Sequence, residues 1–141
     1  LEQVADRSIL KIYPFDKDNP LDFSWLVKSV LNELQKGVPR SEIASAFHRT
    51  YAAMWCVELA KQAVRQKLSR VVLCGGVFQN QLLVDILMPM LRQLGLQPYL
   101  PASVPCNDAG IAVGQMAVTA AWIEQSMNHN DKRHARVVVG L

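Results

Sequence analysis

Two short segments of this sequence carry residues that could bind a phosphorylated ligand or a metal ion. The first is CGGVFQN, residues 74–80, in which Gly75 and Gly76 follow the apolar run 70–73. Glycines let backbone N–H groups approach a ligand closely, and a helix beginning near Asn80 would favour phosphate at its N-terminus. Asn80 could cap that helix or bind a ribose or phosphate oxygen. The pattern predicts either a nucleotide-binding turn or an ordinary tight turn between strand and helix.

The second segment is the loop Cys106-Asn107-Asp108, which precedes the small residues Ala109 and Gly110. Asp108 could simply cap a helix, which would stabilise it by about 1 kcal/mol. Its carboxylate could instead hold a divalent metal ion beside a nucleotide's phosphates, because hard oxygen ligands suit such ions. A parallel α/β sheet binds ligands beyond the carboxyl ends of its strands. We therefore expect the two segments to face a common crevice.

No other spacing predicts catalytic chemistry. Cys74 and Cys106 flank the two segments, but no histidine can be placed beside either one, and buried cysteines usually act as small apolar residues. His48 is interpreted as a helix-face residue, while His129 and His134 are interpreted as solvated. We predict no catalytic residue in this chain.

The elements that must position these segments are predicted from hydrophobic spacing and from capping residues. Strands are expected at 8–13, 70–74 and 97–100. Helices are expected from Pro20, capped by Asn19, to Gly37; from a Ser41 cap to about Lys67, with a buried middle; from about Asn80 to Gly95, with Pro89 inside; and from Asn107 to about Ser126. This last helix has a face of small residues, against which another backbone or a ligand should pass.

This order of elements predicts an α/β fold with a small, mostly parallel sheet flanked by helices. We expect residues 1–126 to form one lobe of a larger molecule and residues 127–141 to form a polar tail. Because the chain opens on Leu1, it is expected to be a piece of a longer protein.

Composition limits the class of protein. The chain has 141 residues, of which 50% are hydrophobic and 19% charged, as expected for one globular domain and not for a disordered chain. The longest apolar run, 51–57, is too short to span a bilayer. The net charge of +3 does not require nucleic-acid binding. Three cysteines without a CxxC pair argue against a disulfide framework and indicate a reducing cytoplasm.

The segments CGGVFQNQLL and CNDAGIAVGQ resemble the carbamoyltransferases that mature [NiFe] hydrogenases, the HypF family. A weaker similarity covers DFSWLVKSVLNELQKGVPRSEIASAFHRTYA, and the resemblance extends over roughly residues 20–122. It implies the second lobe of a Kae1-like domain, with the ribonuclease H-like topology of the sugar kinase, heat-shock ATPase and actin (ASKHA) superfamily.

The resemblance also implies roles for individual residues. The nucleotide-contacting positions of the family match Gly75, Gly76, Val77 and Asn80, and Asn107 is assigned to the same ligand. Asp108 matches the family's late aspartate, one ligand of a divalent zinc or iron ion. The remaining ligands are a His-x-x-x-His pair in the first lobe, which has no counterpart here.

The full enzyme of this resemblance uses carbamoyl phosphate and ATP to form carbamoyl adenylate. It then passes the carbamoyl group to the C-terminal cysteine of the partner maturation protein HypE. This chain would supply nucleotide contacts and one metal ligand, and by itself should be inactive. Three alternatives remain: a tRNA threonylcarbamoyladenosine transferase, a small-molecule O-carbamoyltransferase and a non-enzymatic interaction domain. Phe78, Gln79 and Gly110 favour the hydrogenase family over the tRNA-modifying relatives.

Overall fold

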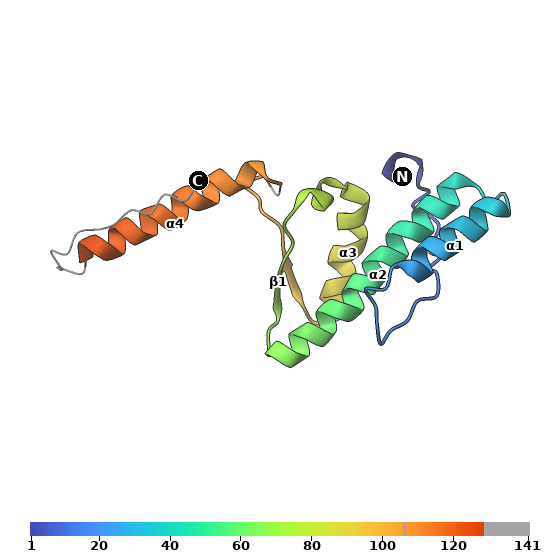
Figure 1. Cartoon of the computed structure of the whole chain (residues 1–141), viewed down its shortest axis with the longest axis horizontal. Helices are drawn as coiled ribbons and strands as arrows, with labels where there is room; N and C mark the ends of the chain where they lie inside the picture. The colour runs from blue at the N-terminus through green and yellow to red at the C-terminus, as the bar shows by residue number, and fades with distance from the viewer. Residues whose placement is uncertain (106, 129–141) are drawn as a thin grey trace.

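The computed structural model describes residues 1–105 and 107–128. Figure 1 shows a body of packed helices and a small sheet, from which the last helix projects. The main helices are α1 (Ser24–Gln35), α2 (Arg40–Gln66), α3 (Gln81–Gln93) and α4 (Ala109–Asn128), and the strands are β1 (Arg70–Val72) and β2 (Gln97–Tyr99). Two short 3-10 helices, η1 (Glu2–Val4) and η2 (Gly76–Gln79), complete the described elements.

In the part of the chain that the structure describes, the sheet has two parallel strands, which are connected through α3. Arg70 is paired with Gln97 and Val72 with Tyr99, and the Leu73 N–H extends the pairing by donating to the Tyr99 carbonyl at 2.8 Å. The predicted α/β fold with a small parallel sheet is confirmed. β1 is not buried on both faces, because Val72 is 67% exposed.

The strand predicted at 8–13 is absent from the described chain, where this segment instead lies along α2. The Tyr13 N–H donates to Thr50 Oγ1 at 2.8 Å, and the Arg49 guanidinium donates to the carbonyls of Ile9 and Arg7 at 2.6 and 3.3 Å. Side chains of α2 thus satisfy backbone groups that a sheet ladder would otherwise pair. The apolar spacing of the segment predicted a strand, but these contacts decide its path.

Two predicted helix starts are also wrong. α1 begins at Ser24, since Asn19 and Pro20 belong to a turn in which the Asn19 carbonyl accepts from the Asp22 N–H at 3.1 Å. The Asp22 carboxylate then accepts the Ser24 N–H at 3.0 Å. The predicted stop is confirmed, because Gly37 has a φ of +73°.

α2 starts one residue before the predicted cap, at Arg40 after Pro39, and Ser41 lies inside its first turn. The buried middle of this helix is confirmed, with Ala52, Met54 and Cys56 at most 3% exposed. Residues of α2 contribute to two apolar clusters. One joins Ala52 and Cys56 to α3, and the other joins Ala46 and Met54 to Leu26 of α1. α2 is therefore the scaffold against which both neighbouring helices pack.

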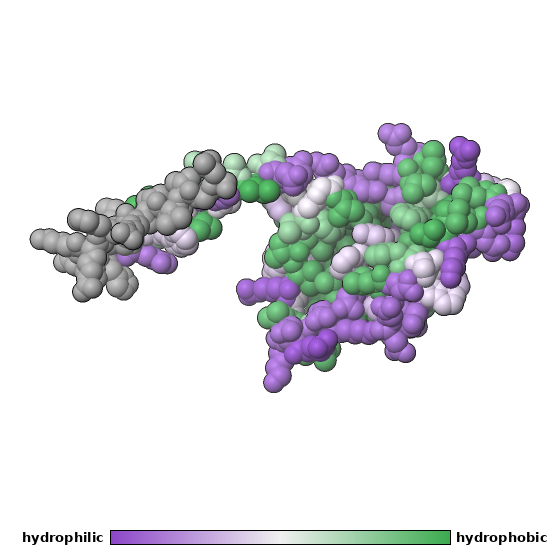
Figure 2. All heavy atoms as spheres, viewed as in Figure 1, coloured by the Kyte–Doolittle hydropathy of each residue, from purple (hydrophilic) through white to green (hydrophobic). Residues whose placement is uncertain are grey.

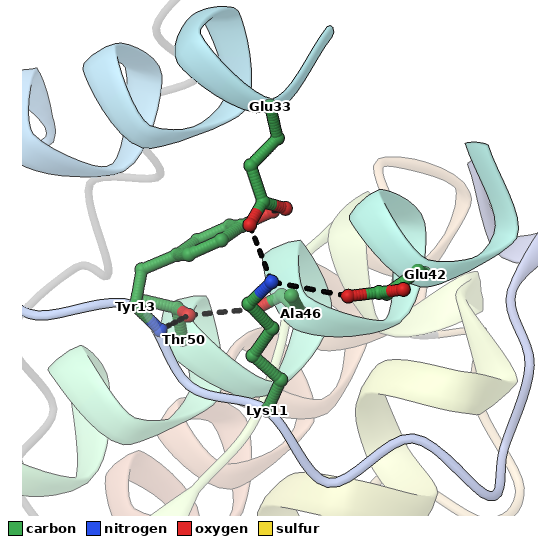
Figure 3. Close-up of polar contacts among 6 residues, drawn as sticks. All are labelled: Lys11, Tyr13, Glu33, Glu42, Ala46 and Thr50. Carbon is green, nitrogen blue, oxygen red and sulfur yellow. Dashed lines mark hydrogen bonds and ion pairs between the residues drawn. The ribbon is translucent and has the colours of Figure 1, made fainter. Parts of the chain in front are cut away.

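A cluster of polar contacts holds residues 11–13 against α1 and α2 (Figure 3). Lys11 Nζ donates to the carboxylate of Glu33, and to that of Glu42 at 3.1 Å. Tyr13 Oη donates to Glu33 Oε2 at 2.6 Å. Burial, together with the hydrogen bond to Glu33, raises the pKa of Tyr13. Partial burial opposes ionisation of Glu33, but the hydrogen bonds from Lys11 and Tyr13 outweigh it and lower the pKa of this carboxyl.

α4 extends away from the body (Figure 1). Large apolar residues in its described part are exposed, among them Met116 at 72% and Trp122 at 68%. The close approach predicted for its small residues is present at Gly110, where an added Cβ would lie 2.4 Å from the Pro105 carbonyl oxygen. It is absent at Gly114, where no described atom outside the neighbouring helix backbone lies within 4 Å of an added Cβ. Of the predicted tail, residues 129–141 lie outside the described chain.

Apolar residues also gather on the surface around β1 and α3, which Figure 2 shows in green. Among the exposed apolar residues, Val72 of β1 is 67% exposed and Val77 of η2 is 47% exposed. None of the described helices is both long and apolar enough to cross a membrane.

Candidate functional site

The glycine turn follows β1 and leads through η2 into α3. Gly75 has a φ of +112°, a conformation that side chains oppose, so the turn itself explains this glycine. Gly76 differs, because its φ is not positive and no described atom lies within 4 Å of where its Cβ would be. Neither backbone strain nor crowding within the described chain requires a glycine at position 76. The backbone at Gly76 is open to a molecule approaching from outside.

Asn80 caps α3, as one of its two predicted roles required. Its Oδ1 accepts the Leu83 N–H at 2.9 Å, while its Nδ2 lies 2.8 Å from Nε2 of His48 on α2. The side-chain amide is therefore engaged on both sides within the chain. A direct contact between Asn80 and a ribose or phosphate stays a prediction.

The N-terminus of α3 is already occupied by a carboxylate from the start of the chain. Glu2 Oε1 accepts the Leu82 N–H at 3.0 Å, and the Arg7 guanidinium donates to Asp85 one turn further along at 2.8 Å. Anionic groups are favoured at this end of a helix. The expectation that this helix end favours phosphate therefore needs correction, since the Leu82 and Leu83 N–H groups both have partners within the chain.

The second predicted segment begins α4. The Asn107 Oδ1 accepts the Ala109 N–H at 3.1 Å, and its carbonyl accepts the Gly110 N–H at 2.9 Å. Asn107, and not Asp108, thus caps the helix. The exposed Asp108 carboxylate accepts no hydrogen bond from another described residue, and Cys106 lies outside the described chain. Because the helix does not use it, the Asp108 side chain is available as a ligand.

The two segments leave the sheet at the same end. Parallel pairing of Val72 with Tyr99 places the turn after β1 beside the chain that continues toward α4, as Figure 1 shows. Within residues 1–105 and 107–128, no three histidine, cysteine, aspartate or glutamate side chains gather to hold a metal ion. From this part of the chain, Asp108 could contribute one ligand to a metal site completed by residues elsewhere.

The two described cysteines differ in burial. Burial raises the pKa of the Cys56 thiol to about 11, so it stays protonated at neutral pH, whereas Cys74 is exposed beside the glycine turn.

His48 is only 3% exposed and engages Ala44 and Asn80. Spacing alone did not link His48 to the turn; the small residues around it, Ala44 to Ala46, were the signal that this helix face is buried.

The glycine turn is an open surface. A hollow of about 630 Å³ is lined instead by Asp18 and by the second half of α2, including Glu58, Lys61 and Arg65. None of the predicted site residues lines it. A ligand on the glycine turn would need walls supplied from elsewhere, as the prediction of one lobe of a larger molecule also requires.

Residues 1–115 match the family model described as "Carbamoyltransferase, Kae1-like Domain, second subdomain". The chain is 38% identical over 101 residues to carbamoyltransferase HypF of Rhizobium leguminosarum bv. viciae, which covers 71% of this chain and 13% of the relative. It is 30% identical over 103 residues to a probable bifunctional tRNA threonylcarbamoyladenosine biosynthesis protein of Methanosphaera stadtmanae, covering 72% and 19% of the two chains.

A crystal structure of full-length HypF in the phosphate- and nucleotide-bound form superposes with a TM-score of 0.64 at 31% identity, covering 70% of this chain and 13% of that one. HypF of T. kodakarensis superposes with a TM-score of 0.61 at 25% identity, covering 73% and 13%. The chain thus spans only a small part of the relatives that it matches.

Proposed function

Since this chain belongs to the carbamoyltransferase family with the Kae1-like domain, we propose that its glycine turn binds the nucleotide of an ATP-dependent carbamoyl transfer. The ligand contacts are backbone groups of Gly75, Gly76 and Val77. Asn80 holds the end of the turn. The neighbouring Asn107 and Asp108 face the same ligand from the segment that follows β2.

The observation that carries this proposal is the open backbone at Gly76. A glycine with ordinary φ and empty space over its α-carbon has no structural need within the described chain. A ligand that lies directly against the backbone would require a glycine at position 76, because any side chain there would occupy the space of the ligand. The α3 terminus contributes less, since Glu2 already accepts one of its N–H groups. The backbone N–H groups of the turn, and not those of the helix end, therefore donate hydrogen bonds to a phosphate or ribose oxygen.

In the whole protein, carbamoyl phosphate is hydrolysed to phosphate and carbamate, and the carbamate displaces pyrophosphate from ATP to form carbamoyl adenylate. The C-terminal cysteine thiolate of a partner such as HypE then takes the carbamoyl group and releases AMP. Adenylation gives the carbamoyl group a good leaving group. This chain contributes positioning, by holding the nucleotide, and electrostatic stabilisation through backbone N–H groups. The chain alone is inactive in this proposal, because the groups that bind carbamoyl phosphate lie in other parts of the protein.

Asp108 is the residue of this chain that would hold a divalent zinc or iron ion. Its exposed carboxylate is a suitable oxygen donor, but one carboxylate cannot hold the ion alone. When bound, such an ion would neutralise charge that develops on phosphate and carbonyl oxygens. Asp108→Asn should therefore weaken metal binding by the intact protein while leaving α4 capped by Asn107.

A second candidate is transfer of a threonylcarbamoyl group to tRNA. The 30% identity to the Methanosphaera stadtmanae protein favours it as the alternative. The same nucleotide turn would serve both reactions. Salt-dependent binding of tRNA would support this alternative, whereas carbamoylation of a peptide that ends in cysteine would support the hydrogenase reaction.

The test is titration of the intact protein with Mg²⁺-ATP, comparing wild type with Gly76→Trp. The indole would fill the open space above residue 76 and should weaken ATP binding more than tenfold, or more than ~1.4 kcal/mol. Gln93→Trp is the matched control, because it adds the same side chain at an exposed position on the opposite end of α3. Equal ATP affinity for Gly76→Trp and wild type, with folding intact, would exclude the proposed site.

A further inference from the structure

We infer that His48 is a positioning residue for the ligand bound at the glycine turn, acting through Asn80. The inference rests on the proposed function, because it concerns the same turn. It adds a residue of α2, far from the turn in sequence, whose side chain reaches the turn through one hydrogen bond. His48 touches no ligand in this scheme.

A chain of hydrogen bonds connects α3 to α2, and in each bond the donor lies on the α3 side. The Leu83 N–H must donate, so the Asn80 atom that it meets at 2.9 Å is the amide oxygen, and the Asn80 NH₂ group therefore faces His48. That NH₂ group lies 2.8 Å from Nε2 of His48, which accepts. On the other side of the ring, Nδ1 lies 2.7 Å from the Ala44 carbonyl, which can only accept.

These partners assign the tautomer of His48. Nδ1 carries the proton and Nε2 carries the lone pair, because a carbonyl lies at the first nitrogen and an amide donor at the second. The side chain is 3% exposed, and Phe47 lies edge-on to the ring at a centroid distance of 5.7 Å. A buried imidazole with both nitrogens engaged has a fixed orientation.

Asn80 transmits that orientation to the turn. Its backbone N–H donates to the Val77 carbonyl at 3.2 Å, and the Phe78 N–H donates to the Gly75 carbonyl at 3.1 Å. The end of the turn is thus tied to α2, the longest described helix, while two adjacent glycines leave its beginning flexible. Fixing the turn in advance reduces the ordering cost of binding. Loss of the hydrogen bond between His48 and Asn80 should therefore weaken ligand binding, although His48 does not contact the ligand.

Two variants break the bond from opposite sides. His48→Phe keeps a buried ring but offers no acceptor, and Asn80→Asp keeps the oxygen for the Leu83 N–H but loses the donor to His48. Each should weaken Mg²⁺-ATP binding by the intact protein about five- to tenfold. His48→Gln places an amide oxygen near the position of Nε2, and it should recover most of the affinity lost in His48→Phe.

Thr50→Val is the matched control. Thr50 is fully buried on the same helix and also makes two hydrogen bonds, to Ala46 and Tyr13, but neither leads to the turn. It should lower stability and leave ATP affinity within twofold of wild type. Hydrogen exchange of the amides of residues 75–79 provides a second readout, which should accelerate in His48→Phe and not in Thr50→Val.

The outcomes separate this inference from the function on which it rests. If wild type binds no ATP, the proposed function is wrong and a positioning role in binding is overturned with it. If wild type and His48→Phe bind equally and turn exchange is unchanged, only the positioning role is overturned. Nitrogen chemical shifts that place the His48 proton on Nε2 would also overturn it, since Asn80 could then not donate.

Discussion

The bond between Tyr13 and Glu33 allows a quantitative test of how the segment at 11–13 is held. Tyr13→Phe removes one oxygen from a residue that is 4% exposed and keeps its ring in the core. The lost hydrogen bond is 2.6 Å long and has a carboxylate acceptor. Bonds to charged groups contribute about 1.5–3 kcal/mol. The Glu33 side chain is 13% exposed and keeps its bond from Lys11, so we expect a loss near the lower end, about 1.5 kcal/mol.

The pH dependence of this loss follows from the pKa shifts. Because the folded state lowers the pKa of Glu33, its contribution is complete above the ordinary value of 4.5 and is lost as the pH falls through the lowered value. Because the pKa of Tyr13 is raised above 10.0, the contribution of the neutral phenol is complete below pH 10.0 and is lost as the pH rises through the raised value. The effect of Tyr13→Phe should therefore be constant near neutrality and shrink in acid.

The assay is native-state hydrogen exchange of amides in α1 and α2 of the intact protein, with rates corrected for intrinsic pH dependence. Tyr99→Phe is the matched control, because Tyr99 is half-exposed and its hydroxyl lies 3.4 Å from Gln97 Oε1; the change should alter stability by less than about 0.5 kcal/mol. A double-mutant cycle that combines Tyr13→Phe with Glu33→Gln isolates the interaction free energy between the two side chains. A cost for Tyr13→Phe that does not shrink as the pH is lowered from 7 through the lowered pKa of Glu33 would refute the charge-assisted bond.

Three further predictions concern packing and reactivity. Leu91→Ala, at a side chain that is fully buried in the α2–α3 core, should destabilise the chain by about 2–5 kcal/mol in denaturant unfolding; a smaller loss would mean that the core collapses around the cavity. Gly110→Ala should displace the start of α4, because its Cβ would lie 2.4 Å from the Pro105 oxygen; unchanged amide exchange in the first turn of α4 would contradict this contact. Iodoacetamide at pH 7.5 should modify Cys74 and spare Cys56, whose thiol is buried with its pKa raised to about 11; mass spectrometry that finds Cys56 modified as fast as Cys74 would contradict this burial.

Elements with local signals were predictable from the sequence. α3 has an asparagine cap, apolar residues at helical spacing and Gly95 after its end, and all three signals lie within fifteen or so residues. The segment at 8–13 was mispredicted because its partners, Arg49 and Thr50, lie on a helix distant in sequence. Local β propensity does not indicate that side chains of another element will satisfy the backbone.

The candidate site shows the same division. The glycine pair and the asparagine cap were visible as a pattern, but the choice of Asn107 over Asp108 as the cap depended on which neighbouring side chain turns back to the helix. The bond between His48 and Asn80 joins residues 32 positions apart, and no spacing rule connects them. The occupation of the α3 terminus by Glu2 is likewise a long-range contact.

The parallel pairing of β1 and β2 has a consequence for how the chain folds. Only η2 and α3 lie between Arg70 and its partner Gln97, so this unit needs only a short chain closure before its contacts form. Residues 1–13 contact α2 and α3 only by returning across a much longer stretch of chain. The strand–helix–strand unit should thus form early and have high φ-values, and the N-terminal segment should dock last, after the transition state.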